Sequence, residues 1–226
     1  MKHKRTKIIA CRTVIEEMQH LLPPDMETLT IEAGLHLNPE KLKSALKTAI
    51  DDITVNTETI ILGYGLCSMG VVGLKAAHSS LVIPRMDDCI AMFLGTRAAY
   101  REELNQEPGT YFLSKGWIDA GISLLDELEM MEERYDPALA ERLMKRMLQN
   151  YKRLAFIDMG SGDLGKYRQS CQKTAMKFNL QYQEIKGTTA FLDKMCNGPW
   201  DDELVVAPPG HEICLADFGM APDERQ

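Results

Sequence analysis

The sequence predicts an α/β protein with a mostly parallel, Rossmann-like sheet, helices on both faces of that sheet, and a second, smaller α/β unit. Three observations lead to this fold class. Apolar, strand-like runs alternate with helical patterns four times within about 100 residues, and the connections between them are short. The same alternation resumes after residue 150. The composition, with 45% hydrophobic and 26% charged residues, is that of an ordinary folded protein.

The first unit is expected to span residues 1–104. An apolar run at residues 7–10 predicts its first strand, and Thr13 with Glu16 matches a capping box that would begin a helix. Residues 28–33 predict the second strand, after which Asn38 and Pro39 supply the cap and first-turn signals of a helix. The apolar face of that helix recurs at helical spacing, through Leu42, Ala45, Leu46, Ala49, Ile50 and Ile53.

Two further strand and helix pairs complete this unit. Residues 59–62 and 81–83 predict buried strands, and the small residues at 70–77 predict a helix that packs closely on the sheet. Asp87 or Asp88 is expected to cap the helix that comes after the fourth strand.

The rest of the chain divides into two segments. Residues 105–150 hold an aromatic strand candidate at 111–113 and a largely helical stretch, and are expected to form a connector or lid. Residues 151–226 predict the second α/β unit, which would close a cleft against the first. The patterns leave open whether the two units share one sheet or form two lobes.

Charge and hydropathy narrow the classes of function. Lys and Arg number 26 against 33 for Asp and Glu, and the net charge of −7 argues against wholesale nucleic-acid binding. The longest uncharged run, residues 59–74, is short and glycine-rich for a membrane span. Six cysteines without an export signal favour the cytoplasm, where free thiols or metal ligands are more common than structural disulfides.

A candidate site emerges from the residues that lie just after the predicted strands. Cys11, His36, Cys67 and Cys89 come after the first, second, third and fourth strands. The carboxyl ends of parallel strands meet at one edge of a sheet, where ligands bind, so these four side chains are expected to lie close together. Cys67 and Cys89 are also expected at helix N-termini, where the exposed amides lower a thiol pKa.

This residue set suits two metal cofactors. Three thiolates with one imidazole match the tetrahedral preference of Zn²⁺, and three thiolates alone can hold a [4Fe–4S] cluster with one iron left open. The sequence does not decide between them. A lone reactive thiol and simple burial of small apolar cysteines are the alternatives, and Cys171 and Cys196 are expected to be structural.

Other polar residues fall at the same predicted edge. Gly63, Tyr64, Gly65 and Ser68 form a turn that resembles an anion cradle, but the spacing matches neither G-x-G-x-x-G nor a P-loop, so a tight turn near a ligand is the favoured explanation of the glycines. In the second unit, Asp158, Ser161 and His211 come after strands; the first two are candidate cofactor contacts, with turn chemistry as the alternative for them. His36 would be a fourth ligand or a catalytic acid or base, and His211 a catalytic group that faces substrate from the opposite side.

Four segments together look like a known pattern: residues 8–11, 63–74, 84–89 and 108–113. They resemble the family of proteins known as domain of unknown function 1638, whose three cysteines correspond to Cys11, Cys67 and Cys89. Such proteins are often encoded near corrinoid-dependent methyltransferases, so the resemblance implies a role in one-carbon metabolism, with a small molecule, a corrinoid protein or a methyltransferase as partner. The alternatives are a non-catalytic accessory of such methyltransferases and a metal-free binding module.

Overall fold

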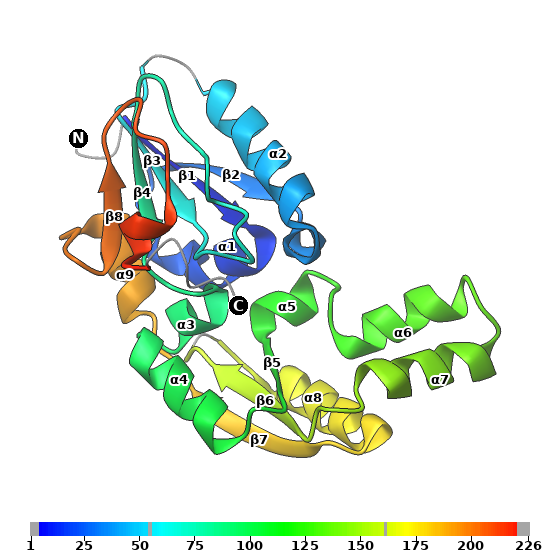
Figure 1. Cartoon of the computed structure of the whole chain (residues 1–226). Coiled ribbons are helices and arrows are strands. Elements are labelled where there is room, and N and C mark those ends of the chain that lie inside the picture. The colour runs from blue at the N-terminus through cyan, green and yellow to red at the C-terminus, as the bar shows by residue number, and fades with distance from the viewer. Residues whose placement is uncertain (1–4, 54–55, 161, 221–226) are drawn as a thin grey trace.

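The computed structural model describes residues 5–53, 56–160 and 162–220, and in these residues the chain forms two sheets. The larger sheet has five strands in the order β2-β1-β3-β4-β8 (Figure 1). Its members are β1 (Thr6–Cys11), β2 (Glu27–Ile31), β3 (Thr59–Gly63), β4 (Ser80–Pro84) and β8 (Leu204–Ala207). The first four are parallel, and β8 runs antiparallel to β4, so the predicted mostly parallel sheet is confirmed.

The smaller sheet contains three parallel strands in the order β5-β6-β7, namely β5 (Thr110–Ser114), β6 (Arg153–Asp158) and β7 (Gln181–Lys186). The two sheets do not follow the segment boundaries expected after residues 104 and 150. β5 comes from the expected connector yet pairs with β6, and β8 comes from the expected second unit yet pairs with β4. The chain therefore leaves the first sheet after β4, builds the second sheet, and returns.

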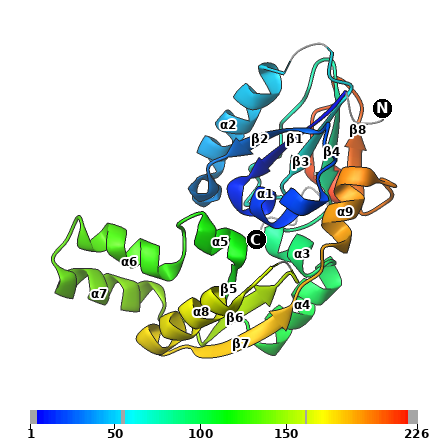
Figure 2. The same ribbon diagram turned by 180° about the vertical axis from the view of Figure 1, so that it is seen from behind.

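Helices flank both faces of the first sheet. Helix α2 (Pro39–Asp51) lies on one side, and α1 (Arg12–Met18) and α9 (Ala190–Asn197) lie on the other (Figures 1 and 2). The start of α2 matches the sequence signals, because the Asn38 side chain accepts a hydrogen bond from the Lys41 amide at 3.1 Å and Pro39 occupies the first turn. The strands between these layers are almost fully buried, except β2 at the edge.

The remaining helices surround the second sheet. They are α3 (Cys89–Phe93), α4 (Arg97–Gln106), α5 (Lys115–Asp119), α6 (Leu124–Glu132), α7 (Pro137–Met147) and α8 (Gly165–Phe178). The antiparallel pair α6 and α7 projects from the body of the molecule as an arm (Figure 1). The largely helical character predicted for residues 119–150 is thus confirmed.

Two predicted local features are wrong. The Thr13–Glu16 capping box is not formed, because α1 begins one residue after Cys11 and the Thr13 hydroxyl donates instead to the Cys11 sulfur at 3.1 Å. The helix expected over residues 70–77 is a series of turns. Gly73 has a φ of +85°, which a right-handed helix cannot contain.

Candidate functional site

One cavity of about 280 Å³ lies at the carboxyl ends of β1, β3 and β4 and gathers the three cysteines singled out by the sequence. Cys11 ends β1, Cys67 lies four residues after the end of β3, and Cys89 begins α3. Cys11 and Cys67 are 7% and 8% exposed. The cavity is completed by Thr13, Glu32, Ala33, His36, Leu42, Gly63, Tyr64, Ser68, Asp87, Asp88, Ile90 and Trp117.

Cys67 is held by backbone hydrogen bonds to the loop after β4. The Leu66 amide donates to the Met86 carbonyl at 2.9 Å, and the Cys67 amide donates to the Asp87 carbonyl at 3.0 Å. A Cβ added at Gly65 would lie 2.5 Å from the Met86 carbonyl oxygen, so only glycine permits this approach. Gly65 therefore allows two loops to approach each other. This role agrees with the tight-turn explanation of the glycines and not with the anion cradle.

The backbone at Cys67 is strained. Cys67, Ser68 and Met69 have φ angles of 43°, 56° and 71°, so three consecutive non-glycine residues are left-handed. Each costs about 1–2 kcal/mol relative to the right-handed region, and such strain clusters at functional sites. Cys67 is consequently not at a helix N-terminus, contrary to the sequence-based expectation.

Cys89 does begin a helix, and Asp88 caps it, as the sequence predicts. The Asp88 carboxylate accepts hydrogen bonds from the amides of Ile90 at 2.9 Å and Ala91 at 3.2 Å, and the Tyr100 hydroxyl donates to it at 3.0 Å. The neighbouring Asp87 pairs with Arg97 at 2.9 Å. The Cys89 thiol is thereby fixed by a short helix of five residues.

The expectation of lowered thiol pKa values is wrong. Burial raises the pKa of Cys67 to about 12, and burial also raises the pKa values of Cys11 and Cys89. The negative charges of the neighbouring thiolates and of Asp88 add to the shift at Cys67 and Cys89. Desolvation outweighs the short helix at Cys89, so these thiols are protonated at neutral pH unless a cation enters the cavity.

Tyr64 presents an unusual group to the cavity. Its side chain is 2% exposed, and its hydroxyl has no hydrogen-bond partner in the part of the chain that the structure describes. Burial and the three neighbouring thiolates raise its pKa. A buried hydroxyl without a partner costs about 1–3 kcal/mol, which a bound ligand would recover.

His36 lies in the cavity wall, on a 3₁₀ helix (Ala33–Leu37) that comes after β2. Its Nδ1 lies 2.6 Å from the Ala33 carbonyl oxygen, so Nδ1 donates and, in the neutral ring, Nε2 is an acceptor. His211 is elsewhere: its Nε2 pairs with Asp217 at 3.0 Å, and it is absent from the cavity wall. The expected approach of both histidines to one cleft is therefore wrong for His211.

Asp158 also lies apart from the cysteines. It accepts the Gly160 amide at 2.7 Å and pairs with Arg168 at 2.6 Å, which is the turn chemistry that the sequence allowed. Ser161 lies outside the described residues.

The three cysteines line one common cavity. Among the residues that the structure describes, no group of three or more His, Cys, Asp or Glu side chains could hold a metal ion. The described cavity wall holds three carboxylates, from Glu32, Asp87 and Asp88, and no Lys or Arg, although Arg97 pairs with Asp87 from outside the lining. The described wall is therefore acidic apart from this pair.

A wider groove of about 910 Å³ continues from this cavity, and the two share His36, Ile90 and Trp117. Its walls come from the 3₁₀ helix after β2, from the stretch α3 through α7 with β5 and both helices of the arm, and from the residues that lead into β6. No sequence pattern had indicated this groove. The aromatic run Tyr111-Phe112 was its available signal, because both side chains line it.

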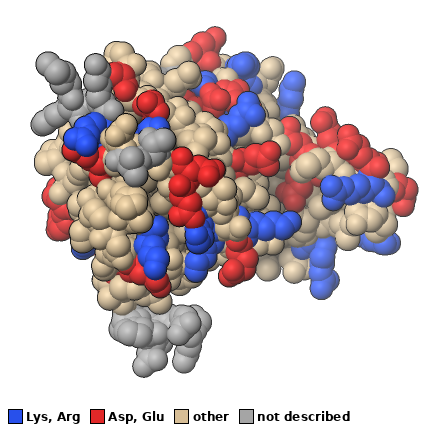
Figure 3. Space-filling view, turned by 90° about the horizontal axis from the view of Figure 1, so that it is seen from above, with Lys and Arg blue, Asp and Glu red and all other residues tan. Residues whose placement is uncertain are grey.

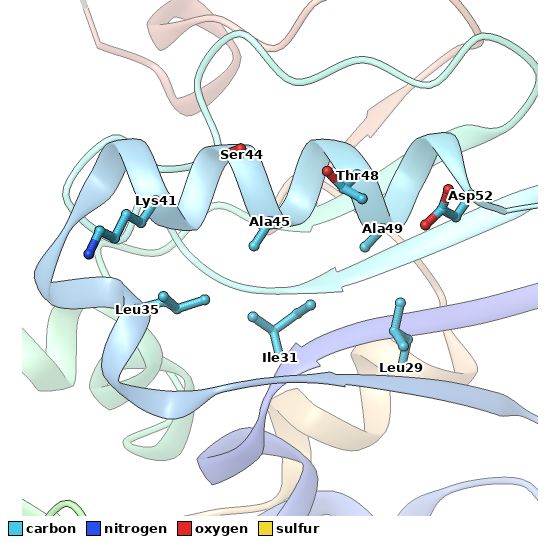
Figure 4. Close-up of a pocket in the computed structure, with 9 residues that line it drawn as sticks. All are labelled: Leu29, Ile31, Leu35, Lys41, Ser44, Ala45, Thr48, Ala49 and Asp52. Carbon is cyan, nitrogen blue, oxygen red and sulfur yellow. The ribbon is translucent and has the colours of Figure 1, made fainter.

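A third hollow, of about 510 Å³, lies between β2 and α2 and is not part of this site. Leu29, Ile31 and Leu35 face Ala45 and Ala49 across it (Figure 4). No cysteine lines it. It is an incompletely filled contact at the sheet edge.

The surface and the helices add two observations. On the face shown in Figure 3, the described acidic and basic residues are interspersed, with no extended field of one sign. Within the described ranges, no helix combines the length and apolar character needed to cross a membrane.

The fold and the cavity together define an α/β protein with a buried three-cysteine pocket at the edge of a parallel sheet. The chain belongs to the family described as "Protein of unknown function (DUF1638)", whose model matches residues 30–196. This match includes Cys67 and Cys89, whereas Cys11 lies before it. No curated protein and no solved structure matches the chain.

Proposed function

We propose that Cys11, Cys67 and Cys89 bind a [4Fe–4S] cluster in an enzyme active centre. The observation that carries this proposal is the meeting of three cysteines from three separate parts of the chain, two buried and Cys89 half-buried, in one cavity with the unpartnered Tyr64 hydroxyl. Thiols with raised pKa values lose their protons when a metal guest compensates the charge, so metal binding and deprotonation would occur together.

A cluster suits the cavity better than a single zinc ion. Zinc needs its ligands to converge at about 2.3 Å for sulfur and about 2.0–2.1 Å for histidine nitrogen. The three cysteines line a space of about 280 Å³, and the described residues contain no group that could hold a single metal ion. A cluster would not require the thiols to converge on one ion, because each thiolate would bind a different iron.

Such a cluster supplies Lewis-acid or redox chemistry at the iron that carries no protein thiolate. The chain's own groups would handle protons there. The Tyr64 hydroxyl can donate a hydrogen bond into the cavity, and His36 can accept a proton at Nε2 because Nδ1 is fixed by the Ala33 carbonyl. Trp117 and Ile90 supply apolar surface to the same cavity wall. A link to corrinoid-dependent methyl transfer rests only on the resemblance.

The test is the iron and sulfide content of protein purified and reconstituted without oxygen. We expect about four irons and four sulfides per chain, with brown absorbance. Cys11→Ser, Cys67→Ser and Cys89→Ser should each lose most of this content. Cys171→Ser is a control matched for burial, since Cys171 is fully buried in α8, and Cys214→Ser is an exposed control.

Three results would count against the cluster. Stoichiometric zinc without iron would replace it with a zinc site. Equal metal content in all five variants would remove the cysteines as ligands. Protein that stays free of iron and zinc after reconstitution, with its fold intact by circular dichroism, would leave only the metal-free binding module.

A further inference from the structure

The groove that continues from the cysteine cavity has a distinctive charge. Glu127, on α6, is the single carboxylate among its described lining residues, and no Lys or Arg lines it. The Glu127 carboxylate is half-buried, and burial raises its pKa. It has no hydrogen bond or ion pair with any described residue, in contrast to Asp126 beside it, which binds Ser123.

Aromatic rings line the same groove as this carboxylate. Tyr111 and Tyr151 pack edge to face with ring centroids 5.8 Å apart, and Tyr100 and Phe112 do so at 5.9 Å. All four line the groove together with Trp117. Tyr111 lies close enough to Glu127 for the carboxylate charge to raise its pKa.

This combination of groups favours a positively charged ligand. Aromatic ring faces attract cations by their quadrupole, and a desolvated carboxylate adds a full negative charge. An anion would meet no Lys or Arg in the wall. A neutral apolar ligand would desolvate Glu127 without replacing its lost water contacts.

We propose that the groove binds an organic ammonium cation whose apolar substituents lie against the aromatic rings and whose charge lies beside Glu127. Because the groove and the cysteine cavity share His36, Ile90 and Trp117, a ligand that extends from Glu127 to these residues would reach the cavity. As a statement of substrate class the proposal rests on the proposed function, whereas cation binding itself needs no cluster.

The test compares two probes of nearly equal shape, choline and its neutral isostere 3,3-dimethylbutan-1-ol, by titration calorimetry on cluster-free protein. We expect choline to bind at least about tenfold more tightly, since only it carries the charge. Glu127→Gln should remove most of this difference. The matched control is Glu129→Gln, an exposed residue on the same helix, which should leave it unchanged.

Tyr111→Leu provides a second variant that keeps Glu127 in place, and it should weaken choline more than the alcohol. Equal affinities for the two probes, or no binding of either, would overturn the proposal. The same titration on Cys67→Ser separates the two proposals. If Cys67→Ser loses iron but still binds choline, both the cluster and the cation groove are supported. If the parent protein binds choline but never takes up iron, only the cation groove is supported.

Discussion

The Ser114 hydroxyl donates a hydrogen bond to Glu17 Oε1 at 2.5 Å and thereby joins the two sheets. Glu17 lies on α1, directly after β1, and Ser114 ends β5. The Gly116 amide donates to the same oxygen at 2.6 Å. Glu17 is fully buried, and its Oε2 has no partner among the described residues. This contact sets the position of Trp117, and hence the wall shared by the cavity and the groove.

Replacing Glu17 by Gln should stabilise the protein at neutral pH. Burial raises the Glu17 pKa above its ordinary value, so the folded state holds the proton more tightly than the unfolded state. The resulting penalty is absent below the ordinary pKa, grows as the pH rises from the ordinary value to the raised one, and is complete above the raised one. Glu17→Gln keeps an acceptor for Ser114, and should gain about 1.4 kcal/mol for each unit of the shift.

The measurement is urea unfolding at several pH values. The gain of Glu17→Gln should be present at pH 8 and absent at pH 4. Glu16→Gln, on the same helix but partly exposed, is the control for the loss of one carboxylate from this helix. A variant that is less stable than the parent at pH 8 would mean that the ionised carboxylate stabilises the contact.

Gly65→Ala should destabilise the fold by about 1–3 kcal/mol, because the added methyl group meets the backbone at Met86. Gly34→Ala is the control, since no atom lies within 4 Å of its added Cβ. Thermal unfolding of both variants distinguishes them. Equal melting temperatures would show that the two loops separate at little cost.

Met69→Gly should be more stable than Met69→Ala by about 1 kcal/mol, because only glycine relieves the left-handed backbone. Both variants lose the same partly exposed side chain, so their difference isolates the strain. The comparison uses chemical unfolding of cluster-free protein. Equal stability of the two would remove the argument that the turn at Cys67 is strained.

Arg153→Met should cost about 3–5 kcal/mol, because it leaves a mostly buried carboxylate at Glu103 without its partner. Arg153 is 4% exposed and also donates to Thr110 at 2.8 Å and to Gln183 at 2.7 Å, so it joins all three strands of the second sheet. Arg168→Met, which breaks more exposed ion pairs, should cost clearly less than Arg153→Met. Similar losses in the urea midpoint would refute this distinction.

Local sequence patterns predicted most elements of the fold. The strands and the helix that begins at Pro39 are set by runs and caps that act over a few residues. The pairing of β8 with β4 could not be predicted in the same way, because 120 positions separate Pro84 from its partner Leu204. Such a pairing depends on the energy of the whole fold, which no local pattern contains.

The meeting of the three cysteines was predictable, because the edge of a parallel sheet has a simple geometry. The position of His211 was not predictable in this way. The prediction placed the strand before His211 in a second unit facing the first sheet, whereas that strand, β8, joins the first sheet itself. The groove escaped prediction for a related reason. Most of its wall comes from the stretch α3 through α7, whose mutual packing has no periodic trace in the sequence.

Because the chain returns from β4 to β8, the second sheet belongs to an insertion within the chain that builds the first sheet. Cys11 and Cys67 belong to the part of the chain that forms the first sheet, while Cys89 lies in the insertion between Pro84 and Leu204. A group bound by all three thiols would therefore cross-link the insertion to the first sheet. With this cross-link, the insertion and the first sheet should unfold as a single cooperative unit. Without it, the insertion can unfold separately while the first sheet keeps its β4–β8 pairing.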